Sequence, residues 1–109
     1  MLSRIVRQFD DLHLTVSETG REGRLRAVSL APSLILLDDA LADCDAHDLM
    51  IYLARTTLRA TVPVAVISGS EVDRMRYIRA GAVAWMAKPL MIDEVKHSMR
   101  TLLDLYSTR

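Results

Sequence analysis

The chain has little of what marks several protein classes. It has 109 residues and a single cysteine, Cys44, which excludes an internal disulfide framework and favours a reducing, cytoplasmic setting. No uncharged stretch reaches the roughly 18 apolar residues of a membrane span, and no signal-peptide pattern opens the chain, so we expect no membrane association. Fourteen basic and fourteen acidic side chains cancel, so no net field would attract nucleic acid directly.

The order of apolar patterns predicts one α/β domain over residues 1–109, with helical and strand segments alternating through short connections. Thr19 with Glu22, Asp45, and Ser70 with Asp73 are helix-start patterns, and Gly81 is a helix stop. The expected elements are a helix at 2–10, a strand at 12–17, a helix at 20–30, a strand at 33–38, a helix at 45–55, a strand from Pro63 to Ser68, a helix at 71–80, a strand at 83–87 and a helix at 91–105.

Three apolar runs each end in a different polar residue. Leu34–Leu37 leads into Asp38, Val64–Ile67 into Ser68, and Ala84–Ala87 into Lys88 and Pro89. If the runs are neighbouring parallel strands, a carboxylate, a hydroxyl and an ammonium converge outside their carboxyl ends, where open α/β sheets bind ligands. That trio suits an acyl phosphate, with Asp38 as nucleophile and the other two as partners for phosphoryl oxygens.

With these residues in these places, the chain resembles the receiver domain of bacterial two-component response regulators. The resemblance runs from about residue 2 to 106: residues 32–38 resemble the segment ending in the phosphoacceptor, 66–69 the switch hydroxyl, and 80–89 the aromatic switch and phosphate-contacting lysine. It implies the flavodoxin-like (CheY-like) doubly wound parallel sheet, for which we expect four strands and five helices.

The resemblance also implies a mechanism of signalling rather than an enzyme with turnover. Asp38 would accept a phosphoryl group from a histidine kinase or phosphotransfer protein, Lys88 would pair with a phosphoryl oxygen, and Ser68 would move toward the new charge. Trp85 would then rotate inward, while a cis bond before Pro89 would aim Lys88. An output protein or domain would dock on the face formed by residues 71–80, 83–87 and 91–105, with Val95 and Met99 inward. Polar groups for that face come from Arg74, Arg76, Tyr77, Lys96 and Arg100.

The chain departs from the family pattern at its start. The family's first strand ends in two acidic residues that help to hold Mg²⁺, whereas here nothing precedes the first helix and Asp10-Asp11 falls at the far end of that helix, exposed to solvent. Weak Mg²⁺ binding is therefore expected, through Asp38 and the backbone carbonyl of Ala40. Asp39 can join the site only if its strand has already ended, because successive strand residues point to opposite faces.

The absent strand would be central in a 2-1-3-4-5 sheet, and buried unpaired backbone groups are costly. Either strand 12–17 closes directly onto 33–38, or a second chain completes the sheet; we favour a homodimer.

Three other functions stay open. The chain could be a pseudo-receiver that binds partners without phosphorylation. A haloacid dehalogenase-type phosphatase would need a second acid where this chain has Ala40, and a flavodoxin-like nucleotide binder would need a hydroxyl- and glycine-rich first loop.

Overall fold

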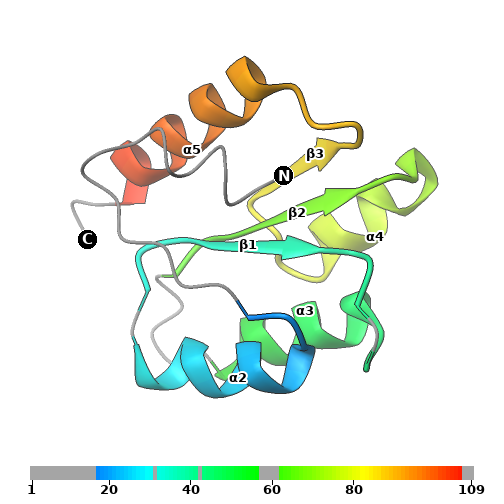
Figure 1. Ribbon diagram of the computed structural model, residues 1–109, viewed down its shortest axis with the longest axis vertical. Helices are drawn as coiled ribbons and strands as arrows, with labels where there is room; N and C mark the ends of the chain where they lie inside the picture. Colours follow the sequence, from blue (N-terminus) through cyan, green and yellow to red (C-terminus); the bar gives the residue numbers. More distant parts are fainter. Residues whose placement is uncertain (1–16, 31, 42, 57–61, 107–109) are drawn as a thin grey trace.

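A three-stranded parallel sheet lies between two layers of helices in the computed structural model, which describes residues 17–30, 32–41, 43–56 and 62–106 (Figure 1). The elements in chain order are α2 (Gly20–Ser29), β1 (Ile35–Asp38), α3 (Ala46–Thr56), β2 (Val64–Ser68), the short 3-10 helix η1 (Glu71–Asp73), α4 (Arg74–Arg79), β3 (Ala84–Ala87) and α5 (Ile92–Tyr106). The strand order is β1-β2-β3, so the central strand β2 pairs on both sides.

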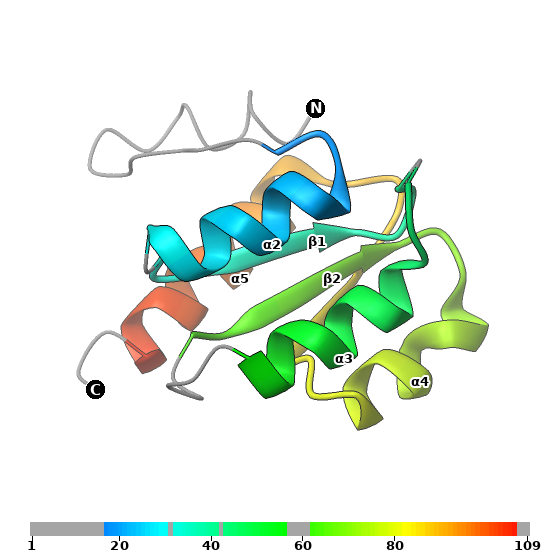
Figure 2. The same ribbon diagram turned by 90° about the horizontal axis from the view of Figure 1, so that it is seen from below.

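The alternation of side chains along the strands builds a core on each face of the sheet. On one face, Ile35 and Leu37 of β1 pack with Leu49, Met50 and Tyr77 of the helices α3 and α4. On the other face, α5 packs against the sheet (Figures 1 and 2). Its side chains there are Val95 and Met99, and their partners are Leu34, Leu36, Met86 and Leu90. Every residue of β2 is buried, which fits an apolar strand covered on both faces.

The helix starts and stops confirm several sequence predictions. The Thr19 hydroxyl accepts a hydrogen bond from Glu22 N at 3.1 Å, and Asp45 Oδ1 accepts from His47 N at 2.8 Å and Asp48 N at 3.2 Å. Gly81 ends α4 with a φ of 116°, a left-handed conformation that side-chain-bearing residues adopt only with strain.

The N-terminus of α2 is tied to the loop after β1. Asp43 accepts hydrogen bonds from Gly20 N at 2.8 Å and Arg21 N at 3.1 Å, which satisfies two of the unpaired donors of the first helical turn. Gly20 is buried there, and a Cβ at that position would collide with Sγ of Cys44. A side chain at position 20 would therefore push the loop away from the helix.

Some sequence predictions need correction, and others lie outside the described residues. The predicted helix at 71–80 is divided into η1 and α4, and Ser70 makes no side-chain capping hydrogen bond. The part of the chain that the structure describes holds three strands and four α-helices, and one further predicted strand and one further predicted helix do not fall within it. The predicted helix at 2–10, Asp10-Asp11 and nearly all of the predicted strand at 12–17 lie outside that part.

Tyr77 was predicted to offer a polar group on the docking face, and this is wrong. Only 5% of Tyr77 is exposed, and its ring packs in the core beside α3, with its centroid 6.0 Å from that of the His47 ring. The short α4 turns this residue toward α3 because Tyr77 and Ile78 both lie on its apolar side. In contrast, Val95 and Met99 are buried as predicted, 1% and 4% exposed.

None of the helices among the described residues is both long enough and apolar enough to span a bilayer.

Candidate functional site

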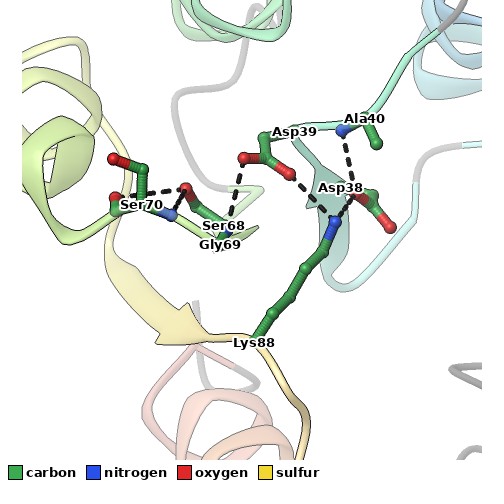
Figure 3. Close-up of polar contacts among 7 residues, drawn as sticks. All are labelled: Asp38, Asp39, Ala40, Ser68, Gly69, Ser70 and Lys88. Carbon is green, nitrogen blue, oxygen red and sulfur yellow. Dashed lines mark hydrogen bonds and ion pairs between the residues drawn. The ribbon is translucent and has the colours of Figure 1, made fainter.

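The three polar strand ends meet at one edge of the sheet, as the sequence predicts (Figure 3). Asp38 is the last residue of β1, Ser68 is the last residue of β2, and Lys88 follows β3 directly. The ladder holds them in register past the strand ends, because Lys88 N donates to Ser68 O at 2.9 Å and Asp39 N donates to Ile67 O at 3.0 Å. The backbone of the central strand thus fixes where the groups on both outer strands lie.

The ammonium of Lys88 is shared between two carboxylates. Its Nζ lies 2.7 Å from Asp38 Oδ1 and 3.0 Å from Asp39 Oδ1, reaching across the end of β2 from β3 to β1 (Figure 3). The side chains of Asp38, Asp39 and Lys88 are 50%, 23% and 33% exposed. Two negative charges and one positive charge therefore share a partly solvated edge, which leaves a net negative charge there.

A turn after Asp38 brings its neighbour into the site. Ala40 N donates to Asp38 Oδ1 at 2.9 Å, a local side-chain turn that ends the extended strand. Asp39 was expected to join the site only if its strand had already ended, and β1 does end at Asp38. Sequence reasoning left the contacts of Asp39 open because the end of a strand cannot be located to one residue from its pattern alone.

Asp39 accepts hydrogen bonds on both of its carboxylate oxygens, whereas both of the hydrogen bonds to Asp38 go to its Oδ1. The Oδ2 of Asp39 accepts a hydrogen bond from Gly69 N at 3.4 Å, and its Oδ1 accepts from Lys88. Burial acts to raise the pKa of the Asp39 carboxyl, but hydrogen bonds from Lys88 and the Ser68 hydroxyl outweigh it and lower that pKa. The hydrogen bond that Lys88 donates to Asp38 raises the pKa of Lys88. Burial acts to lower that pKa, and the hydrogen bond to Asp39 acts to raise it further. Asp39 and Lys88 are therefore both charged at neutral pH.

The hydroxyl of Ser68 is buried at the floor of this edge. Its residue has no exposed surface, and Oγ donates to Ser70 O at 3.3 Å while accepting from Ser70 N at 3.1 Å. These contacts make the turn after β2, which aims Gly69 N at Asp39 (Figure 3). The hydroxyl is satisfied by the turn and also borders the carboxylate of Asp39.

Trp85 and Pro89 flank Lys88 in the chain. The Lys88–Pro89 peptide bond is cis, as the resemblance implied. The indole of Trp85 is half-buried and packs against the α3–α4 core, with Arg74 Cζ lying 5.6 Å from its ring centroid. Its Nε1–H is buried and has no hydrogen-bond partner among the described residues. The ring therefore already points into the molecule.

Two groups of potential ligand atoms bear on metal binding. Asp38 and the carbonyl of Ala40 offer the oxygen chemistry that Mg²⁺ prefers, but Lys88 Nζ competes for the same carboxylate oxygens. A second group, which the sequence analysis missed, joins Asp45, His47 and Asp48 on the first turn of α3. Asp45 Oδ1 already accepts two backbone hydrogen bonds there, so this group serves as the cap of α3.

Comparison with known proteins finds a relative by sequence. The chain is 32% identical over 100 residues to the KDP operon transcriptional regulatory protein KdpE of Escherichia coli (strain K12), covering 90% of this chain and 43% of that protein. The chain thus spans less than half the length of this relative. No protein-family model matches the chain.

Solved receiver domains share its fold. The signal receiver domain of a putative Luxo repressor protein from Vibrio parahaemolyticus superimposes with a TM-score of 0.86 at 23% identity, covering 97% of this chain and 81% of that one. A CheY-like response regulator receiver domain from Methanospirillum hungatei gives a TM-score of 0.86 at 21% identity over 98% and 87% of the two chains. These likenesses confirm the predicted CheY-like fold.

Proposed function

We propose that this chain, which is a receiver domain of the response-regulator type, takes part in two-component phosphorelay signalling by accepting a phosphoryl group on Asp38. A carboxylate oxygen of Asp38 would attack the phosphorus of a phosphohistidine donor. The new O–P bond forms as the P–N bond breaks, and the released imidazole takes up a proton. The product is an aspartyl phosphate on this chain and a histidine on its donor.

The contact between Lys88 Nζ and Asp38 Oδ1 carries this proposal. At 2.7 Å, it places a fixed cation beside the attacking oxygen, where negative charge accumulates as the phosphoryl group arrives. Lys88 is held from both sides, by its backbone bond to Ser68 and by its side-chain bonds. Positioning and electrostatic stabilisation are most of what a protein contributes to phosphoryl transfer, and a fixed lysine beside the acceptor supplies part of both.

Signal output would begin at Ser68 and Trp85. A phosphoryl dianion on Asp38 would compete for the Ser68 hydroxyl, which now bonds to Ser70. Movement of that hydroxyl alters the turn between β2 and η1, and so the packing of Trp85 beneath Arg74 of α4. We therefore place the docking surface for an output protein or domain on the α4-β3-α5 face, built from residues 71–80, 83–87 and 91–105.

Mg²⁺ would assist by screening the phosphoryl oxygens. Asp38 and the Ala40 carbonyl would hold it, and the nearby Lys88 ammonium makes that binding weak. The partners in the relay would be a histidine kinase or phosphotransfer protein. Among the described residues β1 pairs only with β2, so we also propose that a second copy of the chain covers the other edge of β1 in a homodimer.

Intact-mass measurement tests the proposal directly. Incubation with acetyl phosphate and Mg²⁺ should add one phosphoryl group slowly, with labelling that rises with Mg²⁺ concentration. Asp38→Asn should abolish the label, and the matched change Asp39→Asn should leave it in place. Labelling that survives Asp38→Asn, or rapid labelling at low Mg²⁺, would contradict the proposal.

A pseudo-receiver is the second candidate. The observation that favours it is the sharing of Lys88 between Asp38 and Asp39, which occupies the cation before any phosphoryl group arrives. A chain that binds its partner equally well before and after Asp38→Asn, and that never gains a label, would be such a module.

A further inference from the structure

We infer that the carboxylate of Asp39 is a built-in anion that occupies the position a phosphoryl group on Asp38 would need. The inference rests on the proposed function and goes further, because it assigns a role to a residue outside the predicted trio. It holds that Asp39 restrains phosphoryl transfer to Asp38 by competing for the same partners.

The first support is the set of donors around Asp39. Its two oxygens accept from Lys88 Nζ at 3.0 Å and from Gly69 N at 3.4 Å, and the buried Ser68 hydroxyl borders it (Figure 3). An ammonium and a backbone N–H that converge on one carboxylate make an anion-binding site. These donors come from the ends of β2 and β3, whereas Asp39 comes from β1, so the acceptor is brought to them from across the sheet edge.

The second support is the geometry at Asp38. Asp38 and Asp39 share the Nζ of Lys88, at 2.7 Å and 3.0 Å. A phosphoryl group on Asp38 would therefore arrive next to the Asp39 carboxylate, which is already bonded to Lys88. Asp38 is half exposed and open to a donor, but Asp39 is only 23% exposed and turned toward Gly69. The incoming group carries about −1.5 to −2 charges at pH 7 and must displace a carboxylate of like sign.

The third support is the arrangement of the two predicted switch residues, Ser68 and Trp85. Ser68 makes both of its turn contacts with Ser70, and the Trp85 ring already packs inward. Both arrangements are present without a phosphoryl group on Asp38.

Asp39→Asn tests the competition because it keeps the shape and removes the charge. As a single change, Asp39→Asn should speed labelling of Asp38 by acetyl phosphate on the order of tenfold or more. The reason is that it removes a negative charge close to the negatively charged transition state. The acetyl phosphate P–O bond breaks with release of acetate as the Asp38 O–P bond forms. Asp93→Asn, an exposed carboxylate at the start of α5, is the matched control and should leave the rate unchanged.

A second measurement needs no covalent chemistry. Inorganic phosphate is titrated into Asp38→Asn and into the doubly changed Asp38→Asn/Asp39→Asn, and the Gly69 amide is followed by NMR. The doubly changed chain should bind phosphate on the order of tenfold more tightly, because the donors of Lys88 and Gly69 have lost their internal acceptor. The Gly69 amide resonance should also shift on Asp39→Asn before any phosphate is added.

The outcomes separate the two proposals. Equal phosphate affinity in the two variants, or an unchanged Gly69 resonance, would overturn the role given to Asp39. A tighter phosphate site with no label on Asp38 in any variant would support Asp39 as the internal anion and overturn the proposed phosphoacceptor. Equal labelling rates for wild type and Asp39→Asn would overturn the competition even if Asp38 is phosphorylated.

Discussion

At the scale of single residues, Lys88 links the chemistry to the fold. Its ammonium forms ion pairs with two carboxylates, yet its side chain is 33% exposed, so water screens the ion pairs. Function should therefore depend on Lys88 more strongly than stability does. This separation can be measured.

We expect Lys88→Met to slow labelling of Asp38 by about 10- to 100-fold, because the cation beside the attacking oxygen is lost. The free energy of unfolding should fall by only about 0–1 kcal/mol, the usual value for exposed ion pairs. Intact-mass kinetics and urea denaturation measure the two effects. A fall in stability large enough to unfold the chain, with unchanged labelling in the folded fraction, would contradict this prediction.

Trp85 gives a second prediction at this scale. Its Nε1–H is buried and has no partner in the part of the chain that the structure describes, which costs about 1–3 kcal/mol. Phe would remove that donor while keeping most of the ring. We expect Trp85→Phe to leave the free energy of unfolding unchanged or to raise it slightly. Trp85→Ala should lower it by about 2 kcal/mol, since the half-buried ring leaves a gap in the core.

Chemical denaturation of both variants checks this. A loss of more than about 2 kcal/mol for Trp85→Phe would show that the indole N–H has a partner in solution.

At the scale of elements, α2 is positioned by one side chain from a distant loop. Backbone hydrogen bonds from Gly20 and Arg21 lower the pKa of the Asp43 carboxyl below its ordinary value of 3.8. A lowered folded-state pKa contributes stability that is present above the unfolded value and is lost as the pH falls through the folded pKa. The hydrogen bonds between Asp43 and the start of α2 should thus hold at neutral pH and weaken only in acid below about pH 3.8.

We expect Asp43→Asn to lower the melting temperature at pH 7, because Asn offers one neutral acceptor where Asp43 offers two charged ones. The difference from wild type should shrink as the pH falls below 3.8 and Asp43 itself becomes neutral. Melting curves from pH 3 to 7 measure this, with the exposed Glu18→Gln as a control. A difference that stays constant across that range would contradict the role of the charge.

The α4-β3-α5 face carries the prediction on partners. Arg76 on α4 and Arg100 on α5 are exposed, whereas Val95 and Met99 are buried beneath. Charge reversal by Arg76→Glu with Arg100→Glu should weaken binding of the output partner on the order of tenfold, since like charges at an interface are costly. Arg21→Glu on α2 is the control. Titration calorimetry that finds equal affinity for all three chains would place the docking surface elsewhere.

At the scale of the whole molecule, β1 carries the prediction on oligomeric state. Its Ile35–Asp38 backbone pairs with β2 on one side, and its other edge has no strand partner among the described residues. An open strand edge pairs readily with a second chain. We expect a homodimer at micromolar concentration, measured by light scattering behind a sizing column. A stable monomer that unfolds cooperatively would instead indicate that the chain closes this edge itself.

Much of the fold was predictable because short apolar runs and helix caps are local signals. The strands ending at Asp38 and Ser68, the cap at Thr19 and the stop at Gly81 each depend on a few neighbouring residues, and each was found. Tyr77 was not, because which side of a six-residue helix is buried depends on how α4 packs against α3. Ser70 failed as a cap for a similar reason, since its backbone N–H and C=O bond to the Ser68 hydroxyl in a turn.

The sequence by itself determined the trio of Asp38, Ser68 and Lys88, because parallel strands bring their carboxyl ends to one edge wherever they stand in the sheet. Only the tertiary structure decided the role of Asp39. Its position depends on where the pleat of β1 stops and on the turn that Ala40 N makes with Asp38, while its partners come from residues 30 and 49 positions further along the chain. Such contacts leave no periodic trace in a sequence, since they arise only after the sheet has assembled.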